Sequence, residues 1–198
     1  MSENKNIAFR TLEIPEKKAT LSLCVVRFDE EALETYTEWM NDHENIKFLG
    51  RSDQPASIED ERDWLTRQKE NKSNFTFNIV LKDDGGEHLI GNCSVVVPNN
   101  SIHNGILGIT IGNKLYKGQH FGRYALGLLL DWAFSEKNLH CISLTVAENN
   151  LAAIKCYESV GFKKQGIHRD TFYFEGTYIN AVYMDIMRDE FEKNIVRS

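Results

Sequence analysis

The order of elements in the second half of the chain constrains the fold more than any other feature. A strand beginning near Ile106 and ending near Ile111 leads into residues 121–137, where ALGLLLDWAF is apolar on nearly every side, as in a buried helix. The next strand is Cys141–Ala147, in which apolar residues alternate. A strand, a helix and a second strand in this order require a crossover, and such crossovers join parallel strands.

The first half predicts antiparallel pairing instead. Strands at Phe75–Lys82 and His88–Val97 are joined by Asp83-Asp84-Gly85-Gly86, which is a strong hairpin signal. A hairpin next to a crossover unit predicts an α/β fold with one mixed sheet. The further expected elements are strands at Ile7–Leu12, Leu21–Arg27, Phe162–Phe174 and Tyr178–Arg188, and helices at Glu30–Asn41, at Ser57–Glu70, and from an Asn150 cap to Gly161.

Length and composition fit one soluble globular domain. The 198 residues are 41% hydrophobic and 26% charged, which allows a sizeable core. We expect a polar lead-in at residues 1–19, a single domain at 20–190 and a tail at 191–198. No apolar run approaches the roughly 18 residues of a membrane span, and MSENKNIAFR lacks the apolar core of a secretory signal. The expectation is a cytoplasmic protein without membrane contact, either a monomer or a homodimer.

Charge and residue spacing argue against several other classes. The net charge of −6 disfavours a nucleic-acid partner. Histidines and cysteines lack metal-ligand spacing, so we expect no metal, and no G-x-S-x-G motif indicates a hydrolase. The isolated cysteines are interpreted as reduced core thiols; they are Cys24, Cys93, Cys141 and Cys156.

The turn between the strand ending near Ile111 and the apolar helix has the character of an anion site. From His88 to Leu130 the chain has no Asp or Glu, whereas Lys114, Lys117 and Arg123 remain. Unpaired N–H groups and the positive end of the helix dipole meet at such a junction, which predicts a phosphate seat, with an ordinary glycine turn as the alternative. The spacing matches neither G-x-G-x-x-G nor the P-loop motif. The turn consists of Lys117, Gly118, Gln119, His120, Phe121, Gly122 and Arg123.

Two strings resemble a known family. Residues 109–121, followed by Asn150-x-x-Ala153-x-x-x-Tyr157-Glu158-x-x-Gly161-Phe162, resemble the GNAT superfamily of acyl-CoA-dependent N-acetyltransferases. Trp39-Met40-Asn41-Asp42 and Gly166-Ile-His-Arg-Asp170 are similar to the branch that contains ribosomal-protein alanine and spermidine acetyltransferases. The resemblance covers residues 20–188. It implies a splayed mixed sheet of about seven strands flanked by about four helices.

The resemblance also implies roles for individual residues. Acetyl-CoA, the co-substrate, would lie in the splayed opening, with its pantetheine arm paired to the backbone of Ile109 and Ile111. Residues 117–123 would hold its diphosphate, and Asn150 would contact the pantetheine as well as cap its helix. Tyr157 would be the general acid that protonates the leaving thiolate, while the alternative is that it simply packs in the core.

The general base and the acceptor are less well defined. Relatives carry a glutamate where this chain has Ile106 or Thr145. Other groups could take the proton, namely Glu148, His103, His168, Asp170 or a water chain. The chain also has Lys117 where Arg or Gln is common, and His120 where glycine is usual.

Two segments, Trp39–Asp42 and Arg51–Ile58, are expected to form the acceptor wall. Acidic residues there would suit a cationic amine; they are Asp42, Glu44 and Asp53. The resulting prediction is an N-acetyltransferase that moves an acetyl group to a primary amine by direct attack in a ternary complex. The amine would belong to a protein or peptide N-terminus, a polyamine or another small molecule. The alternative is a non-catalytic acyl-CoA-binding sensor.

Overall fold

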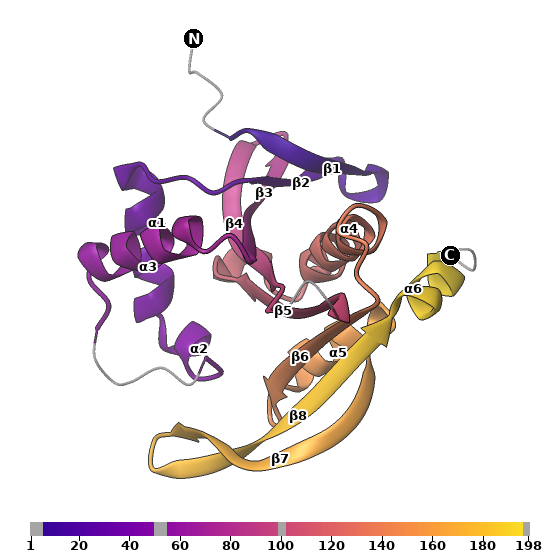
Figure 1. Ribbon diagram of the computed structural model, residues 1–198. Helices are drawn as coiled ribbons and strands as arrows, with labels where there is room; N and C mark the ends of the chain where they lie inside the picture. The colour runs from indigo at the N-terminus through magenta and orange to yellow at the C-terminus, as the bar shows by residue number, and fades with distance from the viewer. Residues whose placement is uncertain (1–5, 50–54, 99–101, 196–198) are drawn as a thin grey trace.

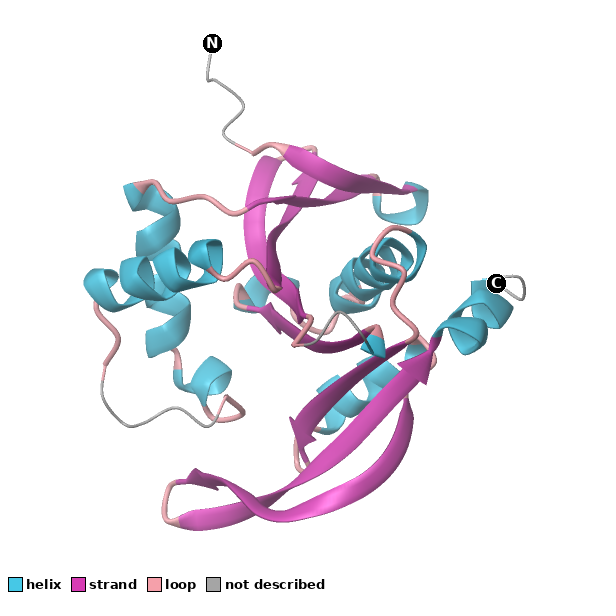
Figure 2. Cartoon of the chain, viewed as in Figure 1, coloured by secondary structure: helices cyan, strands magenta, loops and turns pink. Residues whose placement is uncertain are grey.

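Eight strands form one open sheet in the computed structural model of the chain, which describes residues 6–49, 55–98 and 102–195 (Figures 1 and 2). Their order across the sheet is β1-β2-β3-β4-β5-β6-β8-β7. The strands are β1 (Ala8–Ile14), β2 (Ala19–Val25), β3 (Asn74–Asp83), β4 (Gly86–Val96), β5 (Asn104–Ile111), β6 (Cys141–Ala147), β7 (Lys163–Phe174) and β8 (Thr177–Met187). The helices are α1 (Glu30–Asn41), α2 (His43–Ile46), α3 (Ile58–Glu70), α4 (Phe121–Ser135), α5 (Leu151–Ser159) and α6 (Arg188–Ile195), with short 3-10 turns η1 (Pro15–Lys17) and η3 (Lys114–Tyr116).

The sheet is mixed, as predicted. Strands β5 and β6 pair in parallel, and the other neighbouring strands pair antiparallel. The expected counts of about seven strands and about four helices are too low, because the described residues form eight strands and six helices. Strand β1 lies inside the predicted lead-in and pairs with β2 along its length. Helix α2, with four residues, is too short to show a helical period.

Strands β5 and β6 separate after three residue pairs. Asn104–Ile106 pairs with Cys141–Ser143, and beyond this point β5 pairs with β4 alone while β6 pairs with β8. The sheet is therefore splayed between Leu107–Ile111 and Leu144–Ala147. We call this opening the split.

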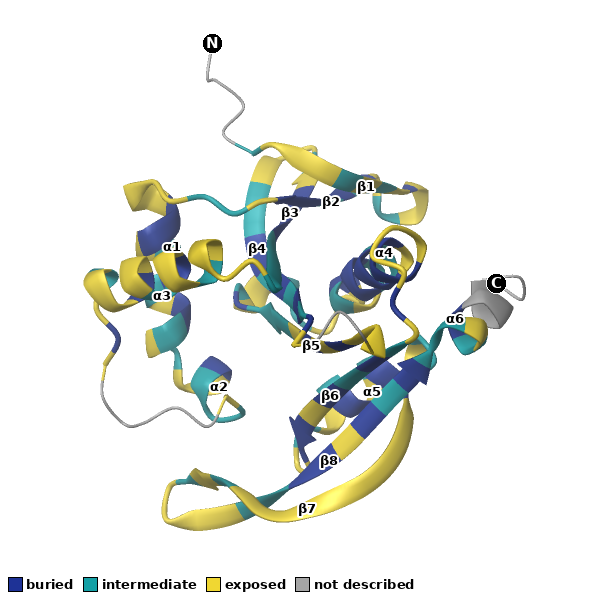
Figure 3. Cartoon of the chain, viewed as in Figure 1, coloured by how far each residue is buried: buried dark blue, intermediate teal, exposed yellow. Residues whose placement is uncertain are grey.

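Helices cover the two faces of the sheet unequally. Helix α4 packs on one face and is buried on most sides, with Leu126, Leu129 and Leu130 fully buried in the main core (Figure 3). Helices α1 and α3 lie on the opposite face and enclose a smaller cluster around Leu33 and Leu65. Strand β7 is exposed over most of its length, and with β8 it forms a long hairpin that reaches away from the main body (Figure 1).

Several local predictions are confirmed and some boundaries differ. Ser57 and Asp60 form a reciprocal capping box at the start of α3, and Asn150 caps α5. Helix α4 ends at Ser135, earlier than the predicted 137, and β5 begins at Asn104 rather than Ile106. Two cysteines are buried as expected and two are half-buried; they are Cys24 and Cys93, and Cys141 and Cys156, respectively. In the part of the chain described, no helix has both the length and the apolar character to span a membrane.

Candidate active site

The edge of β5 that faces the split offers unpaired backbone groups. Past the end of β5, the N–H of Gly112 donates to the carbonyl oxygen of Ile90 on β4 at 3.0 Å. Because successive N–H groups alternate between the two edges of a strand, the N–H of Thr110 also points towards β4. Those of Ile109 and Ile111 point into the split. An extended molecule placed there can pair with β5 as an additional strand would.

The turn between β5 and α4 carries a run of free donors. Within the described residues, the backbone N–H groups of 118–122 donate no hydrogen bond. Gly118 and His120 both take the left-handed conformation, with φ values of 72° and 68°, and this turns the backbone around the start of α4. His120 thus has the backbone conformation that glycine adopts most easily, at the position where the family resemblance indicated a glycine. A concave row of N–H groups at the positive end of a helix is suited to a diphosphate.

The side chains of this turn point in different directions. Arg123 is exposed, and the structure gives it no ion pair with any described residue. Gln119 donates to the carbonyl oxygen of Leu115 at 2.6 Å. Phe121 is buried under the lysine of η1. Lys117 differs from all of these, because its ammonium donates to the side-chain oxygen of Asn45 on α2 and its own N–H is bonded to Lys114.

Helix α5 adjoins the turn and the split. Gly122 faces both neighbours: a Cβ at this position would lie 3.4 Å from Cys156 Sγ and 3.8 Å from Ile111 Cγ1. Asn150 begins α5 and accepts the N–H of Ala153 at 3.2 Å. The structure thus brings together the turn, the open end of β5 and the helix that carries Tyr157.

Tyr157 has a buried ring and an accessible hydroxyl. The residue is 8% exposed and its ring meets Phe162 edge-on at 5.8 Å. Its hydroxyl forms no hydrogen bond with a described residue. The hydroxyl oxygen is accessible to solvent, because the buried side-chain polar atoms without a partner belong to other residues. Burial raises the pKa of Tyr157 well above its ordinary value. The phenol therefore stays protonated at neutral pH and can donate towards a developing negative charge.

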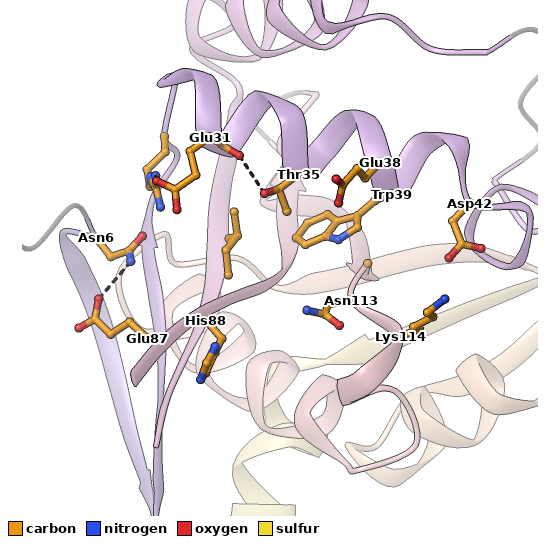
Figure 4. Close-up of a pocket in the computed structure, with 13 residues that line it drawn as sticks. Asn6, Glu31, Thr35, Glu38, Trp39, Asp42, Glu87, His88, Asn113 and Lys114 are labelled. Carbon is orange, nitrogen blue, oxygen red and sulfur yellow. Dashed lines mark hydrogen bonds and ion pairs between the residues drawn. The ribbon is translucent and has the colours of Figure 1, made fainter. Parts of the chain in front are cut away.

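A cavity of about 470 Å³ lies on the other face of the sheet, against α1 (Figure 4). Glu31, Thr35 and Glu38 of α1 and Asp42, the residue after this helix, follow one another at intervals of three or four and all line the cavity. Glu87, Asn113 and Lys114 lie opposite this helix face. The cavity is lined by four carboxylates and two cations, Arg27 and Lys114, and is therefore acidic. Arg27 pairs with Asp29 and, at 3.1 Å, with Glu31 of the lining. The carboxylates are Glu31, Glu38, Asp42 and Glu87.

The segments predicted to form the acceptor wall lie partly at this cavity, and their role stays a prediction. Trp39 and Asp42 line the cavity, whereas Glu44 pairs with Lys47 on the surface. Residues 51–54, including Asp53, lie outside the described residues. Two features were missed: the carboxylates Glu31 and Glu38, which the three-and-four spacing along α1 could have indicated.

The end of β5 is in tight contact with the acceptor wall. A Cβ on Gly112 would lie 2.1 Å from Cδ2 of Trp39, so the indole packs directly on the glycine backbone. No side chain larger than a hydrogen fits there without movement of the ring. The sequence carried no signal for this contact, because it joins residues more than seventy positions apart.

The positions where relatives carry glutamate face the same side as this cavity. The side-chain oxygen of Asn78 accepts the hydroxyl of Tyr36 on α1, so Asn78 lies on the face that α1 covers. Asn78 pairs with Asn92 on β4, and Asn92 pairs with Thr110 on β5. Thr110 therefore lies on the same face, and so does Ile106, four residues before it on β5. Ile106 is level with Ser143 and is 49% exposed, and Thr145 is exposed on this face of β6. Both positions are therefore open to solvent on the α1 side of the sheet.

The other candidate bases lie in three places. His103 lies before β5, at the end where β5 and β6 are paired, and its ring bonds the carbonyl of Asn138. Glu148 accepts the side-chain amide of Asn180 at 2.8 Å, and the oxygen of the same amide accepts the N–H of Asp170 at 3.1 Å. Glu148 and Asp170 line a second cavity of about 420 Å³ beside the end of β6. His168 stacks on Tyr183 in the hairpin. Among the described residues no group of three or more His, Cys, Asp or Glu could hold a metal ion.

Together these features define a class of protein. An open strand edge that leads to a turn of free N–H groups, beside the helix that carries Tyr157, is suited to hold a long thioester that ends in a diphosphate. Residues 22–163 match the acetyltransferase (GNAT) domain family, and the chain belongs to this family. It is an acyl-CoA-dependent N-acetyltransferase.

Relatives resemble the chain over different lengths. The probable N-acetyltransferase YjcK of Bacillus subtilis is 25% identical over 197 residues, which is 98% of this chain and 100% of the relative. The uncharacterized protein MJ1062 of Methanocaldococcus jannaschii is 28% identical over 144 residues. This match covers 72% of this chain but only 28% of MJ1062, which is the longer protein.

Two solved structures share the fold. Spermidine N-acetyltransferase of Vibrio cholerae, in complex with CoA and spermine, superposes with a TM-score of 0.74 at 22% identity, covering 88% of this chain and 98% of that one. RimJ of Mycobacterium smegmatis, in complex with CoA-disulfide, gives 0.76 at 16% identity, covering 93% and 88%. At these identities the likeness establishes the fold.

Proposed function

We propose that the protein transfers the acetyl group of acetyl-CoA to a primary amine by direct attack in a ternary complex. The observation that carries the proposal is that three parts of the molecule lie together at the open end of the split. These are the β5 edge at Ile109 and Ile111, the free N–H groups of residues 118–122, and helix α5, which approaches the turn at Cys156 and carries Tyr157. None of these parts alone is specific, but together they fit a diphosphate, an extended arm and a thiolate leaving group.

Each part would hold a different region of acetyl-CoA. The N–H groups of 118–122 would bind the diphosphate, with Arg123 contributing charge. The backbone of Ile109 and Ile111 would pair with the pantetheine arm, and the N–H of Ile109 would polarise the thioester carbonyl. The side-chain nitrogen of Asn150 has no partner among the described residues while the oxygen caps α5, so the same residue can also donate to this arm.

The proton transfers follow from the pKa values of the two reacting groups. A primary amine with a pKa of about 10 must lose a proton to attack, and a thiolate whose thiol has a pKa of about 8.5 gains one on leaving. Tyr157 supplies the hydrogen bond and proton to sulfur. The amine proton passes to Glu148, His168, Asp170 or a water between them and the acceptor. His103 is the least suitable of the four side chains, because it lies at the closed end of the split.

The acidic cavity supports a small cationic amine as the acceptor. It adjoins the end of β5 through the contact of Trp39 with Gly112, and it presents the carboxylates of α1 to whatever enters. A polyamine would offer one uncharged nitrogen for attack while its remaining ammonium groups pair with these carboxylates. The amine of a protein or peptide N-terminus is the other acceptor to be tested.

A thiol-release assay tests the proposal. Acetyl-CoA is offered with spermidine, spermine, an alanine-terminated peptide and an amino sugar, and CoA affinity is measured separately by calorimetry. We expect turnover that is fastest with the polyamines. Tyr157→Phe should lower kcat about a hundredfold and leave CoA affinity unchanged, because the ring still packs while the proton donor is lost. Tight CoA binding without turnover on any amine would contradict the proposal and identify an acyl-CoA-binding sensor instead.

A further inference from the structure

A buried amide links the acceptor wall to the turn that follows β5. Asn45 of α2 is 6% exposed, and its side-chain nitrogen donates to two backbone carbonyls, that of Trp39 at 3.1 Å and that of Gly112 at 3.0 Å. Its side-chain oxygen accepts the ammonium of Lys117. One side chain therefore joins the end of α1, the end of β5 and the turn before α4.

Lys117 is committed to this link rather than to the free N–H groups beside it. Its backbone N–H is bonded to Lys114, so it adds no donor to the row formed by residues 118–122. Its side chain is half-buried, and Asp42 and Glu44 lie close enough to oppose the lowering of its pKa by burial. The charge of Lys117 thus lies near Asp42, which lines the acidic cavity, and near Glu44 and Lys47, whereas Arg123 is exposed at the first turn of α4.

We propose that Lys117 is a positioning residue of the acceptor site. Through Asn45 it holds α2 and the end of α1 against the end of β5, and so keeps Trp39 on Gly112 at the mouth of the split. The inference rests on the proposed acetyl transfer, because it assigns Lys117 to the amine and leaves the diphosphate to residues 118–123. It implies that the two substrates depend on different cations in the same turn.

Matched substitutions in the turn separate the two roles. Lys117→Met removes the ammonium while keeping an unbranched side chain, Lys117→Arg restores the charge, and Arg123→Gln alters the neighbouring cation. CoA affinity is measured for each variant by calorimetry, and steady-state constants are measured with acetyl-CoA and spermidine. Hydrogen exchange of residues 43–47 reports on α2, whose N–H groups bond back to Asp42 and His43.

The two substrates are expected to respond to different substitutions. Lys117→Met should bind CoA within about twofold of the parent protein, raise KM for spermidine about tenfold and speed exchange in residues 43–47. Lys117→Arg should recover most of the KM. Arg123→Gln should weaken CoA several-fold and leave KM for spermidine unchanged. If Lys117→Met is poorly folded, Lys117→Gln, which keeps a donor and loses the charge, takes its place.

The result that would overturn the inference is also specific. Loss of CoA affinity in Lys117→Met equal to that in Arg123→Gln, with an unchanged KM for spermidine, would return Lys117 to the diphosphate. Failure of the proposed function would look different, because the parent protein itself would then bind no CoA or acetylate no amine. In that second case the exchange of residues 43–47 in Lys117→Met still reports whether the link to Asn45 holds α2.

Discussion

The two faces of the sheet are built in different ways. On the α4 face a continuous apolar core extends from Ile14 to Phe191, and the groups offered to a ligand are backbone N–H groups at the ends of elements. On the α1 face the apolar cluster is small, and the cavity is lined by charged side chains. Main-chain groups can bind a ligand whatever the side chains are, whereas a cavity lined by charged side chains depends on their identity. The difference supports the proposal that one face serves acetyl transfer and the other the choice of amine.

The largest expected effect in stability comes from the α4 face. Leu129 is fully buried in the main core on α4, so Leu129→Ala should reduce the free energy of unfolding by about 3 kcal/mol through lost transfer energy and a cavity. Urea denaturation measures the change. Because the site on this face consists of backbone groups held by packing, the folded fraction should still prefer the same amines. A change in the order of preferred amines would break the division of roles between the faces.

A smaller effect is expected where the faces meet. Gly112→Ala places a Cβ against the indole of Trp39, and the ring must move. Overpacking of this kind should cost about 1–3 kcal/mol in unfolding free energy. KM for the amine should rise while CoA affinity stays near that of the parent protein. Gly108→Ala on the same strand is the control, since its nearest neighbour there is Ser94 Oγ at 3.4 Å. Equal losses in the two variants would argue against a special role for the Trp39 contact.

The smallest expected effect is electrostatic and lies at the start of α1. Asp29 caps this helix, and its hydrogen bonds with the Arg27 guanidinium at 2.6 and 2.7 Å lower its pKa to about 2. A folded-state pKa below the unfolded value of about 3.9 stabilises the protein above that value, and the contribution is lost as the pH falls towards 2. Asp29→Asn keeps a capping side chain and removes the charge.

The difference in unfolding free energy between the parent protein and Asp29→Asn should be about 1 kcal/mol at pH 7, reduced by the partial exposure of the pair. It should be the same at pH 5 and should shrink at pH 3. Urea denaturation at the three pH values measures it. A difference that grows on acidification would show that the pair does not stabilise α1.

Sequence patterns predicted the α4 face well, because its features are local. The apolar helix after β5, the Asn150 cap and the turn rich in N–H groups each occupy a short continuous segment. The left-handed conformation at His120 was indicated only by the resemblance, in which glycine is usual at this position, because a residue before a helix is normally extended. The splay itself came from the resemblance, since nothing in the composition of β5 or β6 shows that their pairing stops at Ile106.

The α1 face was predicted less completely, because its contacts join distant segments. Asn45 is one polar residue in a four-residue helix, and the carbonyl of Gly112 that it binds belongs to a strand end 67 positions away. The fit of Trp39 on Gly112 depends on how α1 settles against the sheet. The carboxylates of α1 were within reach of a periodicity argument, but solvated helix faces show the same pattern. The side chain of Lys117 was assigned to the diphosphate from its place in the turn, and the structure directs it to Asn45.

A structure of the protein with CoA and spermidine bound is the most direct test of this account. The account predicts diphosphate oxygens about 3 Å from the N–H groups of residues 118–122, and the sulfur next to the Tyr157 hydroxyl with the amine arriving from the α1 side. A diphosphate bound elsewhere on the molecule, or a sulfur that cannot reach Tyr157, would contradict it.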